Sequence, residues 1–201
     1  MNNKLPVVIV LAAGHGARFA GPGHKLEQPL AGSTVLGCTL EVALATQLRV
    51  VVVVNEALSP LVRRTVAARD VVTLGGNGPK GMGLSIAAGV SAAAASPGWL
   101  ILPGDMPLLR PSSIRAVSAQ LLQDPVVFAQ YRGQRGHPVG FSSELFSELI
   151  ALDGDGGAKR LLARFAAQGV EVDDPGVLMD IDTAADLERA RAHWAKVDAA
   201  A

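Results

Sequence analysis

Apolar positions along the chain gather into short, fully apolar runs separated by stretches of helical periodicity. The first run, residues 7–10, is β-branched and apolar at every position rather than at alternate ones. This pattern is typical of a strand buried on both faces, as in a parallel sheet covered by helices. Residues 50–54 form a second fully apolar strand pattern, and two more strands are predicted at residues 71–74 and 99–102.

Between these runs the sequence predicts helices. Ser33 is a good cap for a helix over residues 33–46, in which every fourth residue from Leu36 to Leu44 is leucine. Ser59 followed by Pro60 has the form that opens a helix, predicted to end near residue 68. Two further helices are predicted over residues 83–95 and 112–122. Alternating strands and helices favour an α/β fold with a doubly wound, mainly parallel sheet in three layers.

The second half of the sequence is less regular. It predicts a strand at 126–130, helices at 142–149 and 158–167, and short strands at 170–172 and 178–181. Thr183 is predicted to cap a final helix, with Asp186 at the matching capping-box position. Because no repeat or long linker divides the chain, we expect one domain over residues 1–201.

A glycine-rich segment follows the first strand and carries the first candidate chemistry. Gly14 and Gly16 allow backbone N–H groups to approach a ligand closely, since no Cβ stands in the way. Arg18 and Lys25 add positive charge suited to phosphate oxygens. The segment therefore favours a phosphate site at the end of a strand, although a turn that only reverses the chain gives a similar pattern.

Known nucleotide-binding loops do not fit this segment. The dinucleotide fingerprint needs a third glycine where Phe19 stands, and the P-loop needs Ser or Thr where Leu26 follows Lys25. A protein-kinase glycine loop lacks its H-R-D and D-F-G partners elsewhere in the chain. The segment is thus a different kind of phosphate loop or a simple turn.

Carboxylates stand at the ends of two other predicted strands. Asp105 directly follows the strand at 99–102, and such a carboxylate is either a ligand for a hard cation such as Mg²⁺ or an acceptor of N–H groups in its own turn. Asp180 and Asp182 point to one side of an extended chain and Ile181 to the other. Asp182 is an alternative cap for the last helix, but a shared metal bound to phosphates accounts for both Asp105 and Asp182.

Composition narrows the classes of function. The charges of the 18 basic and 18 acidic residues cancel, so the chain has no excess positive charge for binding a nucleic-acid backbone. Aromatic residues make up only 4% of the 201, which argues against stacking on the bases of a single strand. The single cysteine, Cys38, excludes an internal disulfide and falls in a helical pattern as a small core residue.

The N-terminal apolar run needs separate consideration, because Lys4 followed by a run ending at Ala12 and Ala13 resembles a short signal peptide. The run is too short to span a bilayer, and its removal would take away the most buried strand. We therefore expect a cytoplasmic protein with no membrane partner.

Four ordered motifs together resemble a known family. L-A-A-G-x-G-x-R with a later lysine, L-P-G-D-M-P, G-H-P-V and D-I-D-T-x-x-D-L resemble the MobA-like nucleotidyltransferases, and among these most closely the molybdenum cofactor cytidylyltransferases. The resemblance implies a Rossmann-like fold of the nucleotide-diphospho-sugar transferase type. It also implies a Mg²⁺-bound nucleoside triphosphate and transfer of its nucleoside monophosphate to an acceptor phosphate, with release of pyrophosphate.

The resemblance assigns roles to individual residues. It implies a nucleotide-binding half over about residues 1–123 and an acceptor-binding half over about 124–201. Arg18 and Lys25 would neutralise the phosphates, and Asp105 and Asp182 would bind the metal. The implied nucleotide-binding residues are Leu11, Ala12, Ala13, Gly14, Gly16, Gly76, Gly81, Gly83 and Ser85, and the implied acceptor-binding residues are His137, Asp155 and Asp180. His137 is equally well explained as a structural donor in a tight turn.

The resemblance also implies the substrates. Ala13 stands where guanosine-using members tend to carry glycine, which favours CTP over GTP as the donor. The expected acceptor is molybdopterin, with a molybdenum hydroxylase as a client protein. The alternatives are a guanylyltransferase, a transferase for a sugar or other small phosphate, and a chaperone that only holds the finished cofactor.

Overall fold

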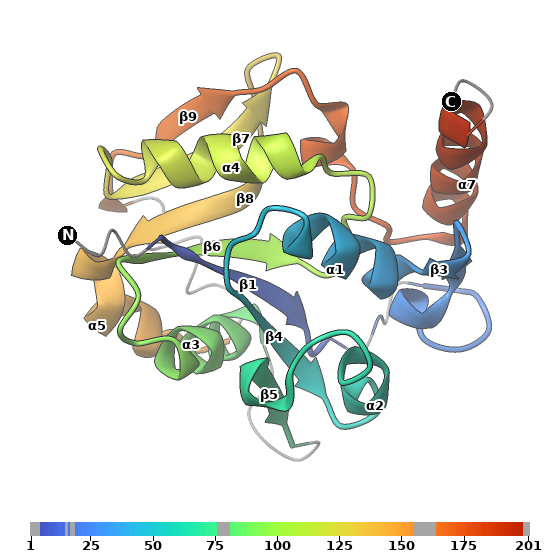
Figure 1. Cartoon of the computed structure of the whole chain (residues 1–201), viewed down its shortest axis with the longest axis horizontal. Helices are drawn as coiled ribbons and strands as arrows, with labels where there is room; N and C mark the ends of the chain where they lie inside the picture. Colours follow the sequence, from blue (N-terminus) through green and yellow to red (C-terminus); the bar gives the residue numbers. More distant parts are fainter. Residues whose placement is uncertain (1–4, 15, 17–18, 76–80, 155–163, 199–201) are drawn as a thin grey trace.

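The computed structural model describes residues 5–14, 16, 19–75, 81–154 and 164–198 (Figure 1). Its centre is a seven-stranded sheet with the strand order β5-β4-β1-β6-β8-β7-β9. The strands are β1 (Val7–Ala12), β4 (Val50–Asn55), β5 (Val71–Leu74), β6 (Gly98–Pro103), β7 (Val126–Tyr131), β8 (Gln134–Ser142) and β9 (Gln168–Glu171). A two-stranded ribbon, β2 (Pro29–Leu30) and β3 (Ser33–Thr34), lies outside this sheet.

The sheet is mainly parallel, as the sequence predicted. β5, β4, β1 and β6 are parallel neighbours, and Ile9 of β1 lies between Val51 of β4 and Ile101 of β6. β8 runs antiparallel to both β6 and β7, and β9 is parallel to β7. The carboxyl ends of β1, β4, β6 and β7 therefore meet at one edge of the sheet, where ligands bind in folds of this kind.

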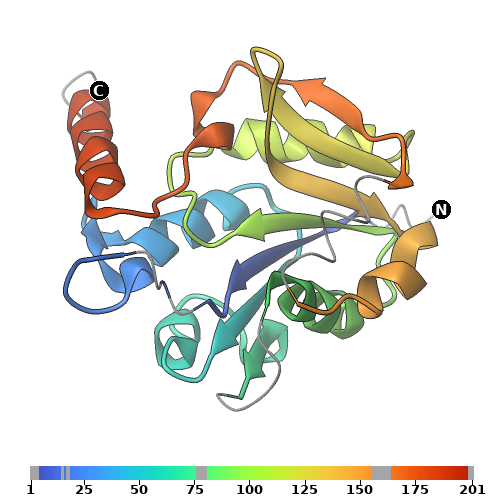
Figure 2. The same cartoon turned by 180° about the vertical axis from the view of Figure 1, so that it is seen from behind.

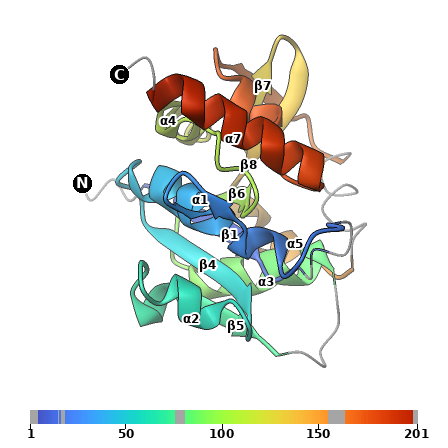
Figure 3. The ribbon, with the colours of Figure 1, turned by 90° about the vertical axis from the view of Figure 1, so that its right-hand side faces the viewer.

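Helices cover both faces of the sheet, which gives the expected three layers (Figure 3). Side chains of α1 (Val35–Leu44), α2 (Ser59–Val62), α4 (Pro111–Gln120) and α7 (Ala184–Asp198) belong to the core on one face. Those of α3 (Met82–Ala92) and α5 (Phe146–Ile150) belong to the core on the other face. The described residues also contain four short helices, η1 (Lys25–Glu27), η2 (Ala68–Asp70), η3 (Ser143–Leu145) and η4 (Pro175–Leu178).

Helix α7 stands at one end of the molecule beside the β2–β3 ribbon (Figure 2). Thr183 and Asp186 form the predicted capping box: the Asp186 carboxylate accepts the Thr183 N–H at 2.7 Å, and the Thr183 hydroxyl accepts the Asp186 N–H at 3.2 Å. Further along the helix, the Arg191 guanidinium donates to the Pro29 carbonyl. Within the described ranges, no helix is long and apolar enough to cross a membrane.

Two helix boundaries differ from the prediction. Thr34 rather than Ser33 caps α1, because Ser33 pairs with Leu30 in the ribbon while the Thr34 hydroxyl accepts the Gly37 N–H at 3.0 Å. Helix α2 ends at Val62 instead of near residue 68, since the chain turns there and buries the β-branched Val66 in the core. The helix predicted at 142–149 is divided between η3 and α5, and most of the one predicted at 158–167 lies outside the described residues.

Strand β8 was not predicted from the sequence, in which glycines interrupt the segment after the strand at 126–130. Gly136 and Gly140 instead permit close packing, Gly136 against η4 and Gly140 against the neighbouring strand β7. A Cβ at Gly136 would lie 2.2 Å from the Val177 carbonyl oxygen, and one at Gly140 would lie 2.6 Å from the Val127 side chain. The strand predicted at 178–181 is also wrong, because residues up to 178 belong to η4.

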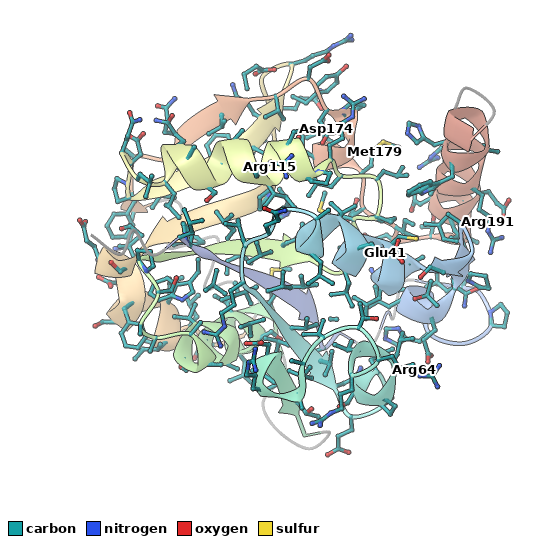
Figure 4. All side chains as sticks on the ribbon, viewed as in Figure 1. Glu41, Arg64, Arg115, Asp174, Met179 and Arg191 are labelled. Carbon is teal, nitrogen blue, oxygen red and sulfur yellow. The ribbon has the colours of Figure 1, made fainter. Side chains whose placement is uncertain are left out.

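Asp174 is the buried carboxylate that fixes η4 against α4 (labelled in Figure 4). Its oxygens accept the Arg110 N–H at 2.8 Å, the Ser113 hydroxyl at 2.7 Å and the Gly176 N–H at 2.9 Å. The N-terminus of α4, which has no cap of its own, is thus capped from a distant segment.

We expect Asp174→Ala to lower the free energy of unfolding by about 2–4 kcal/mol, since it leaves buried donors without an acceptor. Urea unfolding measures this loss. Asp173→Ala removes an exposed carboxylate one residue away and should change the same free energy by less than about 0.5 kcal/mol. Equal effects in the two variants would contradict the role of Asp174.

Candidate active site

The predicted phosphate and metal residues meet at the carboxyl edge of the sheet. The Lys25 ammonium lies 2.6 Å from the Asp105 carboxylate and 2.9 Å from the Asp182 carboxylate. The three side chains are each only 13–19% exposed. Residues separated by 80 and 157 positions therefore form one partly buried charged cluster.

Backbone contacts hold the two aspartates in place. The Gly104 N–H donates to the Leu11 carbonyl at 2.9 Å, which sets the turn after β6 against the end of β1. The Ile181 N–H donates to the Asp105 carbonyl at 2.9 Å and brings Asp182 beside it. The Asp182 carboxylate faces Lys25, and Thr183 performs the capping that was the alternative role for Asp182.

His24 positions Lys25 and was not singled out from the sequence. Its Nδ1 accepts the Leu26 N–H at 3.2 Å, so its Nε2 carries the proton and donates to the Gly14 carbonyl at 2.9 Å. The ring thereby links the glycine segment to η1. The signal in the sequence that could have indicated this role is a polar residue directly before Lys25, at the start of a short helix.

The charges in the cluster shift the pKa values of its members. Burial lowers the Lys25 pKa, but the Asp105 and Asp182 carboxylates outweigh that effect and raise it overall. Partial burial of its carboxyl group and the nearby negative charges of Asp182 and Asp105 raise the pKa of Asp180. Lys25 is therefore held in its charged form, and Asp180 lies close enough to the cluster to respond to it.

The carboxylates fit a divalent cation. Asp105 Oδ1 is buried and has no hydrogen-bond partner among the described residues, so Asp105 does not accept N–H groups in its own turn as the alternative required. Carboxylate oxygens are the ligands that Mg²⁺ and Mn²⁺ accept. The described residues contain no group of three or more metal-ligating side chains.

The glycine segment lies directly against this cluster. Gly16 has a φ of +64°, and a Cβ added there would lie 3.2 Å from the Lys25 side chain. Ala12 is buried in the sheet, and Leu11 and Ala13 pack against the core on the α3 side. Of the predicted site residues, Arg18, Gly76 and Asp155 lie outside the described residues.

The start of α3 contacts the loop after α5. The Gly83 N–H donates to the Gly154 carbonyl at 2.9 Å, and a Cβ at Gly81 or Gly83 would lie less than 3.0 Å from Gly154 backbone atoms. Ser85 is buried in the next turn. Independently of any role in nucleotide binding, only glycine fits at positions 81 and 83, because a side chain there would collide with the loop.

Asp180 lines a pocket of about 140 Å³ next to the charged cluster. Its other lining residues come from the segment between β6 and α4, from η4, from the segment that connects η4 to α7, and from α7, and are Leu108, Leu178, Met179, Ile181, Asp186, Arg189 and Ala190. Asp180 is exposed and Ile181 is buried, so the two point in opposite directions as predicted even though they do not form a strand.

His137 lies on β8, with its Nδ1 buried and without a hydrogen-bond partner among the described residues. Burial lowers the His137 pKa, against a smaller raising effect of the Asp105 charge and of a hydrogen bond to the Ile101 backbone. Arg135 lowers it further. The imidazole is therefore neutral near pH 7 and within the electrostatic reach of Asp105.

The lowered pKa of His137 predicts acid sensitivity. Below the unfolded pKa of about 6.5 the unfolded chain gains a proton that the folded chain resists. The contribution of His137 to the free energy of unfolding is thus fully present above that pH and decreases as the pH drops toward the pKa of the folded state. We expect urea unfolding between pH 7.5 and 5.5 to show a smaller loss for His137→Asn than for the wild type, and equal losses would contradict this role.

Comparison with known proteins decides the family. The MobA-like NTP transferase domain matches residues 8–171, which include β1, the glycine segment, Lys25 and Asp105. The chain belongs to the MobA-like NTP transferase family. The resemblance stated from its motifs is therefore confirmed, and the protein is a nucleotidyltransferase of that family.

Relatives of this MobA-like NTP transferase extend over nearly the whole chain. The purine catabolism protein PucB of Bacillus subtilis is 30% identical and covers 95% of this chain and 98% of its own. A nucleotidyl transferase from Methanothermobacter thermautotroptrophicus is 25% identical, with a TM-score of 0.78 over 96% of this chain and 99% of its own. Rv0371C of Mycobacterium tuberculosis H37Rv, in complex with manganese, is 27% identical, with a TM-score of 0.75 over 94% and 98%.

Proposed function

We propose that this protein is a Mg²⁺-dependent cytidylyltransferase that transfers CMP from CTP to the phosphate of molybdopterin and releases pyrophosphate. The observation that carries this proposal is the Lys25 ammonium held between the Asp105 and Asp182 carboxylates at the carboxyl edge of the sheet. A nucleotidyl transfer needs charge neutralisation and positioning of this kind rather than a protein nucleophile.

In the proposed reaction an oxygen of the acceptor phosphate attacks the α-phosphorus of CTP in line. The bond from that phosphorus to the bridging oxygen breaks, and pyrophosphate leaves with the electron pair. Asp105 and Asp182 would hold the divalent cation, which neutralises the triphosphate when bound. Lys25 would then contact the phosphate oxygens instead of the two carboxylates, with Arg18 as the second cation.

The residues around the glycine segment support a role in nucleotide binding. Backbone groups of residues 12–14 stand at the end of β1, Gly16 lies beside Lys25, and Gly81, Gly83 and Ser85 stand at the start of α3 at the same edge of the sheet. The methyl group of Ala13 is the feature that favours cytidine over guanosine. The manganese complex of the related mycobacterial protein supports a divalent cation in the reaction.

Thermal unfolding with Mg²⁺ and each of CTP, GTP, ATP and UTP tests this proposal. A nucleotide at about 100 times its dissociation constant should stabilise the fold by about 2.7 kcal/mol, which raises the unfolding temperature by a few degrees. We expect CTP to give the largest rise, and only when the metal is present. Release of pyrophosphate on addition of molybdopterin then tests the acceptor.

The other outcomes are equally informative. A larger rise with GTP would make the protein a guanylyltransferase of the same mechanism. Turnover with a sugar phosphate but not with molybdopterin would show that the acceptor is a sugar phosphate. Binding of the finished cofactor without pyrophosphate release from any nucleotide would contradict catalysis and favour a cofactor chaperone.

A further inference from the structure

The β7–β8 hairpin brings an additional arginine to the edge of the sheet that holds the charged cluster. β7 has the same direction as β6, because both are antiparallel to β8, so the hairpin tip follows the carboxyl end of β7 (Figure 2). Ile101 pairs with Val139, and continuing this register by two residues places His137 level with Pro103. Arg135, two residues nearer the tip, is then level with the turn that carries Asp105.

The Arg135 guanidinium is stacked on an aromatic ring. Its central carbon lies 4.0 Å from the centroid of the Phe128 ring, although the residue as a whole is exposed. Stacking restricts the side chain and leaves the N–H groups at the edge of the guanidinium plane available to an anion. No described residue forms an ion pair or hydrogen bond with this guanidinium.

Glu171 is a carboxylate that contacts the hairpin tip and is already bound there. Glu171 accepts the Arg132 N–H at 2.6 Å, the Gly133 N–H at 3.4 Å and the Gln130 side-chain amide at 2.9 Å. These bonds hold the hairpin tip against β9. Glu171 is therefore a structural acceptor and does not neutralise Arg135.

His137 lies beyond Arg135 on the same face of β8, since side chains two residues apart in a strand share a face. Its ring lies within electrostatic range of both the positive charge of Arg135 and the negative charge of Asp105. The buried His137 Nδ1 has no hydrogen-bond partner in the described part of the chain. An unneutralised arginine and an unsatisfied imidazole nitrogen thus stand together beside the candidate metal ligand.

We propose that Arg135, supported by His137, binds the phosphate monoester of the acceptor on the side of the site opposite the nucleotide. A planar guanidinium suits two oxygens of a phosphate group, and the stacked ring fixes its orientation. The identity of the acceptor rests on the proposed function, whereas the binding of a phosphate anion at Arg135 rests on the hairpin alone.

The first test follows histidine side-chain NMR signals during titration with inorganic phosphate. The chain has four histidines, and His24 and His137 report on the two sides of the site. We expect phosphate to shift the His137 signal, with a dissociation constant raised about tenfold or more in Arg135→Gln. Arg135→Lys should give an intermediate value, because it keeps the charge but loses the planar donors.

Arg132→Gln is the matched control. Arg132 belongs to the same hairpin and also lies over a ring, with its central carbon 5.1 Å from the Tyr131 centroid. Tyr131 packs toward the α4 core, however, whereas Phe128 packs toward the α3 core. Removal of this second arginine should therefore leave the phosphate affinity unchanged. Equal losses in the two variants would show a diffuse charge effect and overturn the proposal.

The second test measures steady-state turnover with CTP and molybdopterin. Arg135→Gln should raise the KM for molybdopterin by about 10–100-fold and leave the KM for CTP unchanged. A rise in the KM for CTP of the same size would place Arg135 on the nucleotide side and overturn the proposal, as would phosphate binding that is the same in wild type and Arg135→Gln.

Failure of the proposed function has a different signature. Titration with CTP and Mg²⁺ should shift the His24 signal in wild type and in Arg135→Gln alike. If CTP leaves His24 unchanged while phosphate shifts His137 through Arg135, the cytidylyltransferase proposal fails and the phosphate subsite stands. If phosphate shifts only His24, the subsite is wrong whatever CTP does.

Discussion

Replacement of Asp105 by alanine should lower turnover by a factor of about 10³ or more and leave the protein folded. Removal of a group that positions charge at the reacting phosphate costs activity on this scale. The effect on stability should be small, because Asp105 Oδ1 is buried with no hydrogen-bond partner among the described residues, so the substitution removes an unsatisfied atom together with one contact of Lys25. Pyrophosphate release and thermal unfolding measure the two quantities.

Asp173→Ala is the control for this substitution, since it removes an exposed carboxylate outside the charged cluster. Its turnover should equal that of the wild type. A well-folded Asp105→Ala variant with wild-type turnover would remove the metal-ligand role of Asp105, and with it the main support for the proposed mechanism.

Replacement of Lys25 by methionine should have a large effect on activity and a second effect on stability that depends on metal. Turnover should fall by about 10²–10³, because phosphate charge is no longer neutralised at that position. In the absence of nucleotide and metal, the substitution leaves two partly buried carboxylates without the Lys25 ammonium that they share. The free energy of unfolding should therefore fall by about 1–3 kcal/mol.

Addition of Mg²⁺ or Mn²⁺ without nucleotide separates these effects. The metal should restore the unfolding temperature of Lys25→Met but change that of the wild type little, since Lys25 already neutralises both carboxylates. Arg49→Met, which breaks the more exposed ion pair with Asp70, should cost less than about 1 kcal/mol and show no response to metal. A Lys25→Met variant with normal stability and no response to metal would contradict the bridging role of Lys25.

The sequence predicted the fold best where burial on both faces leaves a fully apolar run. β1, β4 and β6 lie within two residues of their predicted bounds because their predicted runs contain no polar residue. β8 was missed because its glycines are explained by close contacts with Val177 and Val127, and these residues lie elsewhere in the sequence. Asp174 was missed for a similar reason, since the donors it satisfies at Arg110 and Ser113 belong to another helix.

The candidate site shows the same limit. Position after β1 and after β6 was enough to expect Lys25 and Asp105 at one edge of the sheet, and Asp182 joins them although the strand predicted before it does not form. The direct contact of Lys25 with both carboxylates was not predicted, because it depends on side-chain directions set by His24 and by the turn after β6. Arg135 attracted no attention in the sequence, where nothing connects it to the ring of Phe128.

The bond from the Gly83 N–H to the Gly154 carbonyl ties the segment that begins α3 to the loop after α5. Since a side chain at Gly81 or Gly83 would collide with Gly154, the two segments cannot diverge independently during evolution. A relative that changes this loop to accept a different substrate must keep glycine at both positions or rebuild the start of α3. A chimaera designed to exchange acceptor preference should therefore carry both segments from the same parent.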